Sequence, residues 1–177
     1  ILEAPAILPP SQEALDAQLV ELARKCYADP LKFVQIAYPW REKGTLLEAH
    51  DGPDVWQQAF LNDISAEVRK HDFDGVHPVM PILRAVSKGH GVGGSVMCAW
   101  LVDWITVTRP HSQGVVTANT QVQLATKTWA AIRRWTRMML WAHWFTINTQ
   151  KMYHAAYPES WFCTAPTCRP ENSEAFA

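Results

Sequence analysis

The sequence predicts an α/β protein, in which a parallel sheet is flanked by helices and preceded by an N-terminal helical segment. Three observations support this prediction: helical apolar spacing before residue 71, a short apolar run that leads into a glycine-rich loop, and an apolar helical stretch directly after that loop. We divide the chain into a helical segment, residues 1–78, and a core, residues 79–177, whose sheet we expect to be incomplete.

Composition indicates one globular domain with a substantial core, since 48% of the 177 residues are hydrophobic and 19% are charged. The net charge of −1 gives no overall field that would recruit nucleic acid or anionic lipid. The most apolar stretch, Ser95–Thr108, is interrupted by Asp103 and is shorter than the roughly 20 residues that span a bilayer. We therefore expect a cytoplasmic protein with reduced cysteines, and we disfavour a zinc site at Cys163 and Cys168. The chain opens without Met or a signal peptide, which we take to indicate a piece of a longer protein.

Capping residues predict where the first helices begin. Ser11 can cap a helix whose apolar positions recur at helical spacing up to residue 26. Asp29 and Pro30 supply an N-cap and a first-turn proline for a second helix, which Pro39 ends. After a loop rich in Gly, Pro, His and acidic residues, a third helix is expected from about Pro53 to Lys70.

The second half of the chain predicts strands that alternate with helices. Met80–Ser87 is expected to be a strand, Ser95–Thr108 a helix, and Gly114–Ala118 a second strand. Strand, helix and strand in this order predict a βαβ unit of a parallel sheet. A further strand is expected within Trp144–Tyr157, and no element is expected in Pro158–Ala177.

A long amphipathic helix is predicted from about Thr120 to His143, and a rotation of 100° per residue separates its two sides. The side expected to be buried carries Leu124, Ala125, Thr128, Trp129, Ile132, Trp135, Thr136 and Met139. The opposite side carries the basic residues Lys127, Arg133, Arg134 and Arg137. A solvated face is the favoured interpretation of these four, and contact with a phosphate backbone is the alternative.

The glycine-rich segment KGHGVGGS nearly matches the phosphate-loop pattern G-x-x-x-x-G-K-[ST]. Lys88 stands at the first glycine position and Gly94 at the lysine position, so the lysine is displaced. A lysine stem is long enough to fold over a bound phosphate from there, and the Ser95 hydroxyl could hold Mg²⁺. A structural turn is the alternative. The candidate phosphate-binding residues are Lys88, Gly89, His90, Gly91, Val92, Gly93, Gly94 and Ser95.

Four segments together resemble the large terminase subunit of tailed bacteriophages, which packages viral DNA into a preformed capsid. They are GPDVWQ (52–57), SKGHGVGGS (87–95), VVTANTQVQLATKTW (115–129) and ENSEAFA (171–177), in the order and spacing of that family. The resemblance implies a P-loop NTPase-like sheet that binds ATP and Mg²⁺. It also implies that Lys88, Gly93 and Ser95 lie on the phosphate loop, and some terminases likewise carry the loop lysine at its start.

The resemblance assigns an adenine-recognising role to Gln57, with Gln58 as the neighbouring candidate; an ordinary surface amide is the other reading. Many family members carry an arginine in the loop where this chain has His90 or Gly91. A neutral histidine stabilises developing negative charge less well, so this substitution weakens the expectation of catalysis.

The family also implies partners and a missing part. Its acidic strand and catalytic glutamate come soon after a segment like ENSEAFA, so we expect this chain to hydrolyse ATP slowly or not at all alone. The implied partners are double-stranded viral DNA, the portal protein, the small terminase subunit and further copies in a ring, all in the host cytoplasm. The alternative to a packaging motor is a non-catalytic prophage remnant, an interaction module or a DNA-binding module.

Overall fold

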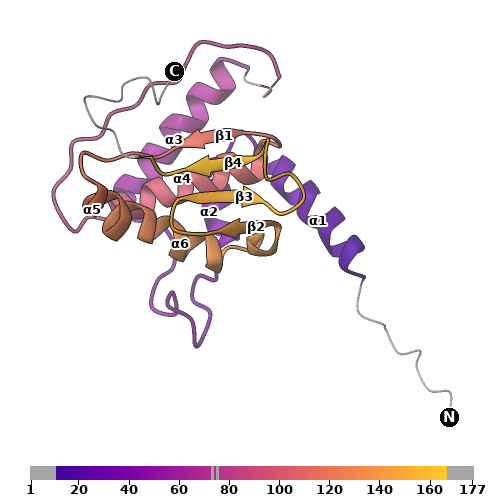
Figure 1. Cartoon of the computed structure of the whole chain (residues 1–177), viewed down its shortest axis with the longest axis horizontal. Coiled ribbons are helices and arrows are strands. Elements are labelled where there is room, and N and C mark those ends of the chain that lie inside the picture. The colour runs from indigo at the N-terminus through magenta and orange to yellow at the C-terminus, as the bar shows by residue number, and fades with distance from the viewer. Residues whose placement is uncertain (1–10, 73, 75, 167–177) are drawn as a thin grey trace.

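The computed structural model describes residues 11–72, 74 and 76–166, which form an α/β structure with a small mixed sheet (Figure 1). The principal helices are α1 (Gln12–Lys25), α2 (Pro30–Ala37), α3 (Val55–Lys70), α4 (Gly94–Thr108) and α6 (Trp129–Met138). A short turn, α5 (Gln121–Gln123), and a π-helical turn (Leu124–Thr128) precede α6, and a 3₁₀ turn (Ala142–Trp144) follows it. The strands are β1 (Gln113–Val115), β2 (Phe145–Ile147), β3 (Lys151–His154) and β4 (Phe162–Thr164).

The sheet has the order β1-β4-β3-β2. β1 runs parallel to β4, with Gly114 opposite Cys163, whereas β4 with β3 and β3 with β2 are antiparallel. The close approach at Gly114 leaves little room for a side chain, because a Cβ there would lie 3.2 Å from the Cys163 Sγ. Within the described residues, the expected parallel pairing is therefore limited to β1 with β4.

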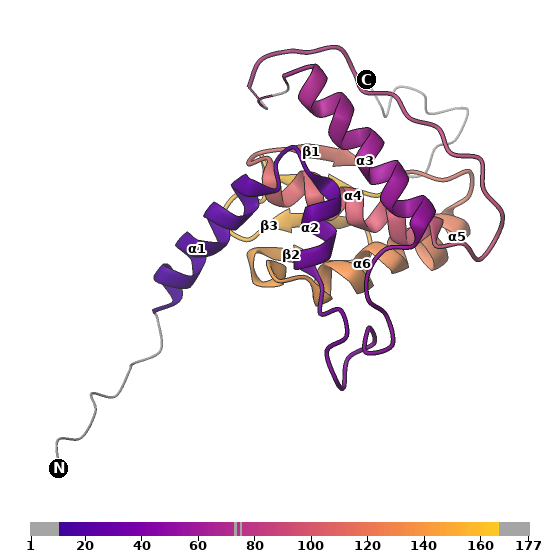
Figure 2. The same ribbon diagram turned by 180° about the vertical axis from the view of Figure 1, so that it is seen from behind.

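Helices cover one face of the sheet in two successive layers (Figures 1 and 2). α4 contacts β1, β4 and α6, and α2 packs against both α4 and α3 on the far side. The core between these layers is rich in tryptophan, and Trp129, Trp141 and Trp100 are among its most deeply buried side chains. Large aromatic rings give this small sheet the apolar area that three- and four-residue strands alone could not bury.

The predicted starts of the first three helices are confirmed. The Ser11 side chain accepts a hydrogen bond from the Ala14 N–H, and the Asp29 side chain accepts one from the Lys32 N–H, with Pro30 in the first turn. α3 begins at Val55, two residues after the predicted proline, because Asp54 rather than Pro53 acts as its N-cap. These signals lie within one turn of the residues they order, so they act independently of the rest of the fold.

The predicted strand at Met80–Ser87 is wrong, because this segment is extended but pairs with no strand in the described chain. Ile82 is partly buried and packs on the core, whereas Met80 and Leu83 are exposed. The segment runs alongside α3 and α4 instead of entering the sheet (Figure 2). The predicted βαβ unit is wrong for the same reason, since the parallel partner of β1 is β4.

Three further predictions differ from the structure in the strands. The second predicted strand exists, but as Gln113–Val115 instead of Gly114–Ala118. The single strand expected within Trp144–Tyr157 is a hairpin, β2 and β3. The segment Pro158–Ala177 was expected to hold no element, yet β4 lies within it and in the middle of the sheet. These strands are short and sit beside prolines and turn residues, so their pairing comes from tertiary contacts that no local pattern carries.

The long helix predicted from Thr120 to His143 is interrupted and ends at Met138. In the π-helical turn the Trp129 N–H donates to the Leu124 carbonyl, which adds one residue to that turn. The inserted residue rotates the part of the helix that precedes it, which is why Ala125 is exposed although the predicted apolar side included it. Among the described residues, no helix is long and apolar enough to cross a membrane.

Candidate functional site

The glycine-rich loop lies at the N-terminus of α4, as predicted. Gly91 and Gly93 have φ of +79° and +82°, a left-handed conformation that side chains disfavour, and Gly93 is the N-cap of α4. The Gly93 carbonyl accepts the first helical hydrogen bond, from the Met97 N–H at 3.0 Å. No side chain of the described residues caps α4, so its first-turn N–H groups face the loop with the positive end of the helix dipole. This arrangement can bind an anion.

Lys88 folds back over this loop. A Cβ built on Gly94 would overlap the Cε of Lys88 and would lie 2.5 Å from its Nζ. The Lys88 side chain therefore occupies the space that the Cβ of any other residue at position 94 would fill. In the sequence, Lys88 stands at the first position of the phosphate-loop pattern instead of the lysine position. In the structure, its ammonium group nevertheless lies beside Gly94, at the N-terminus of α4.

Gln57 connects the loop to α3. Its Oε1 accepts a hydrogen bond of 2.8 Å from the Asp54 N–H and completes the capping box of α3. Its Nε2 donates to the Gly93 carbonyl at 3.5 Å, and Gln57 is buried with 6% of its surface exposed. The fold thus brings Gln57 and the loop into contact across 36 positions of sequence. Gln58 is exposed, and its Nε2 donates to the Pro53 carbonyl at 2.8 Å.

An open pocket of about 650 Å³ lies between the loop and the segment that leads into α3. The loop contributes Gly91 to Gly93, the other wall comprises residues 50–55 with Gln57 and Gln58, and tryptophan rings with Leu47 and Val96 line the rest. The lining tryptophans are Trp40, Trp100 and Trp135. Pockets of this size accommodate small organic ligands.

The aromatic part of this pocket is a packed cluster with Tyr38. The centroids of the Tyr38 and Trp135 rings are 4.8 Å apart and those of the Trp100 and Trp135 rings 5.2 Å, both edge to face. The Trp100 Nε1 is buried and meets no acceptor among the described residues. The sequence pattern did not identify Trp40, Trp100 or Trp135 as pocket residues, because the helical spacing of Trp135 and the apolar stretch around Trp100 indicate only a core.

The donor set for Mg²⁺ at the loop consists of one hydroxyl, that of half-buried Ser95 in the first turn of α4. No group of three His, Cys, Asp or Glu side chains able to hold a metal is found in the described part of the chain. A Mg²⁺ ion at the loop would take its remaining ligands from phosphate oxygens and water. Cys163 is buried in β4, and Cys168 lies outside the described residues, as does the segment ENSEAFA.

Asp103 is a second polar feature that the sequence left unexplained. It is fully buried on α4 and accepts hydrogen bonds from the Tyr38 hydroxyl at 2.8 Å and the Thr136 hydroxyl at 2.7 Å. Burial raises the pKa of Asp103 to about 7, although both hydroxyl hydrogen bonds act in the opposite direction. These contacts make Asp103 a residue of the core.

The predicted basic side of the long helix is only partly exposed. Lys127, Arg134 and Arg137 are exposed, whereas Arg133 is half-buried and its Nε meets no hydrogen-bond acceptor in the described chain. The predicted buried side is confirmed at Leu124, Trp129, Ile132, Trp135, Thr136 and Met139. Thr128 is half-buried.

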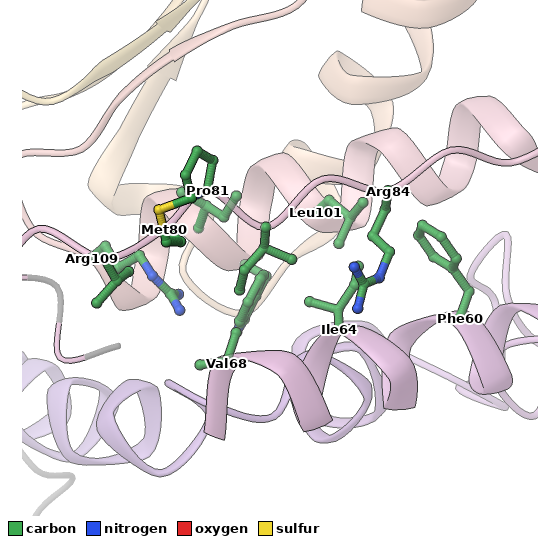
Figure 3. A pocket seen from close by; sticks show the side chains of 12 residues that line it. Phe60, Ile64, Val68, Met80, Pro81, Arg84, Leu101 and Arg109 are labelled. Carbon is green, nitrogen blue, oxygen red and sulfur yellow. The ribbon is translucent and has the colours of Figure 1, made fainter. Parts of the chain in front are cut away.

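A separate, more apolar cavity of about 460 Å³ lies between α3, α4 and the extended segment 79–84 (Figure 3). Ile64 and Val68 line it from α3, and Met80 and Pro81 from the extended segment. Arg109 lies at one end, where its guanidinium group stacks at 4.2 Å on the Tyr27 ring and at 4.3 Å on the Trp104 ring. The segment that was predicted to be a strand thus forms a wall of this cavity.

In comparisons with known proteins, no family model, no curated protein and no solved structure matches the chain.

Proposed function

We propose that this chain is the ATP-binding part of a viral DNA-packaging motor, which in the intact protein couples ATP hydrolysis to DNA translocation. The observation that carries the proposal is the position of Lys88 over Gly94 at the start of α4. Without a ligand, an ammonium group beside a helix N-terminus is unfavourable, because the positive end of the helix dipole repels it. A phosphate group between the two would be attracted by both.

The pocket beside the loop supports a nucleotide rather than an inorganic anion. Its aromatic residues and its volume of about 650 Å³ suit a planar base and a sugar attached to phosphates held at the loop. The identification with a terminase rests on the four sequence segments. Of these, 52–57, 87–95 and 115–129 lie in the described residues, and the first two are in contact through Gln57 and Gly93.

Each group of the loop has a distinct role in the proposed binding of ATP and Mg²⁺. The N–H groups of the first turn of α4 donate to phosphate oxygens, and the Lys88 ammonium group neutralises their charge. Ser95 offers its hydroxyl to Mg²⁺, which neutralises phosphate charge when bound. Phosphoryl transfer depends almost wholly on such positioning and neutralisation, so this site supplies the binding half of an ATPase.

Titration of the full chain with a fluorescent ATP analogue and Mg²⁺ tests the proposal. Lys88→Ala removes a charge-assisted contact, so we expect its affinity to fall about tenfold or more. Lys25→Ala is the matched control, because Lys25 is an exposed lysine on α1, paired only weakly with Glu21 at 3.8 Å. Equal affinity of wild type and Lys88→Ala would remove Lys88 from the site. If wild type binds no nucleotide, the interaction-module alternative takes precedence.

The exposed basic residues on the long helix favour duplex DNA as a second candidate ligand of the same chain. Lys127, Arg134 and Arg137 are exposed and could contact a phosphate backbone without rearrangement. The expected signature is an affinity that falls steeply with salt, together with a shallower salt slope in the double variant Arg134→Ala and Arg137→Ala. Binding that does not change between 50 and about 200 mM salt would reject this candidate.

A further inference from the structure

Both ends of the Gln57 amide are hydrogen-bonded to the protein backbone. Its Oε1 accepts from the Asp54 N–H at 2.8 Å, and its Nε2 donates to the Gly93 carbonyl. An amide that reads adenine must present both its donor and its acceptor to the base edge. Here the acceptor holds the start of α3, and the donor points at the phosphate loop.

The contact with Gly93 is also steric. A Cβ on Gly93 would lie 2.7 Å from the Gln57 Nε2, so the glutamine side chain packs directly against the loop backbone. Gly93 is in the left-handed conformation at φ +82°, and its carbonyl begins the hydrogen bonds of α4. A side chain that fixes this peptide also fixes the direction of the N–H groups that follow it.

We propose that Gln57 is a positioning residue, which holds the phosphate loop in its anion-binding conformation from α3 and does not read the nucleobase. This inference rests on the proposed nucleotide binding and specifies how the site is organised. Gln57 thereby acts on the phosphates through Gly93, and its loss lowers the affinity for every ligand that carries a triphosphate. Selectivity for the base then depends on other residues of the aromatic pocket.

The test compares three ligands on the full chain: ATP, GTP and inorganic tripolyphosphate, each with Mg²⁺ and measured by calorimetry. Gln57→Met keeps the length of the side chain and removes both hydrogen bonds. We expect it to weaken all three ligands by a similar factor of about five to ten, the value of one or two ordinary hydrogen bonds. Gln57→Glu keeps the acceptor for Asp54 but sets a carboxylate against the Gly93 carbonyl, so we expect a larger and again uniform loss.

Ser65→Ala is the structural control. Ser65 is buried on the same helix α3, its hydroxyl donates to the Ala28 carbonyl at 2.6 Å, and it is not among the described residues that line the pocket. We expect this variant to lower the melting temperature as Gln57→Met does, and to change tripolyphosphate affinity less than about twofold.

The outcomes separate this inference from the proposed function. Failure of the wild type to bind any of the three ligands refutes the nucleotide site itself. If the wild type binds and Gln57→Met weakens ATP alone, Gln57 reads the base and the inference is wrong. It is equally wrong if Ser65→Ala weakens tripolyphosphate binding as much as Gln57→Met does, or if Gln57→Met leaves all three affinities unchanged.

Discussion

The buried carboxyl of Asp103 makes the stability of this protein depend on pH in an unusual direction. Its pKa is raised to about 7 in the folded chain, from 3.8 for the free side chain. Between these two values the folded state retains a proton that the unfolded state has released, so stability falls as pH rises from about 4 to 7 and levels off above 7. A difference of about three units corresponds to about 4 kcal/mol, a large share of the 5–15 kcal/mol typical of a domain.

Asp103→Asn removes the titration and keeps the shape of the side chain. Its carbonyl oxygen can still accept from the Tyr38 hydroxyl, and the Thr136 hydroxyl can turn to accept from the amide. We expect the variant to be more stable than wild type by about 2–4 kcal/mol at pH 8 and similar to it near pH 4.5.

Urea denaturation followed by tryptophan fluorescence at pH 4.5, 6 and 8 measures this difference, and an unchanged m-value shows that the denatured state is the same. Asp51→Asn is the control, because Asp51 is exposed and its Arg41 partner, hydrogen-bonded at 2.8 Å, lowers its pKa. Parallel pH curves for wild type and Asp103→Asn would refute the reasoning, since they would show that Asp103 does not titrate in this range.

Three further predictions concern the loop. The double variant Lys88→Gly and Gly94→Lys should retain the nucleotide affinity that Lys88→Ala loses, because a lysine at either position can place its ammonium group at the start of α4. The fluorescent-ATP titration compares wild type, Lys88→Ala and the double variant. Mg-ATP should slow alkylation of Cys98, an exposed thiol on the first turns of α4, as peptide mass spectrometry would show, whereas an unchanged rate would place the ligand elsewhere. Gly93→Ala should lower stability by about 1–2 kcal/mol in thermal unfolding, because of its positive φ and the overlap with Gln57, whereas Gly89→Ala, with open space around it, should be neutral.

The parts of the fold that the sequence predicted correctly are those ordered by near neighbours. Ser11, Asp29 and Pro30 begin helices through bonds and dihedral preferences within one turn, and their effects need no partner elsewhere. The strands did not follow local pattern. Residues 80–87 have the apolar character of a strand but no neighbouring strand to pair with in the described chain, whereas Phe162–Thr164 is only three residues long, too short for a period to show, yet pairs on both sides.

In the candidate site, too, the features that depend on near neighbours in the sequence were predicted and the long-range contacts were not. Glycine spacing predicted the loop, and the length of the lysine stem predicted that Lys88 could fold over it, as it does. The resemblance pointed to Gln57 but gave it a role in reading the base. The bond of Gln57 to the Asp54 N–H belongs to a capping box three residues apart, whereas its contact with Gly93 joins positions 36 apart, which no local pattern encodes.

The parallel pairing of β1 with β4 affects the order in which the chain can fold. Gly114 and Thr164 are hydrogen-bonded across 50 positions, so β1 has no sheet partner while the intervening residues are still being synthesised. The helices α1 to α4 lie entirely before β1 and can pack earlier. Sheet closure is then the late step of biogenesis, and a ribosome paused before residue 164 would carry helices already assembled beside an unpaired strand.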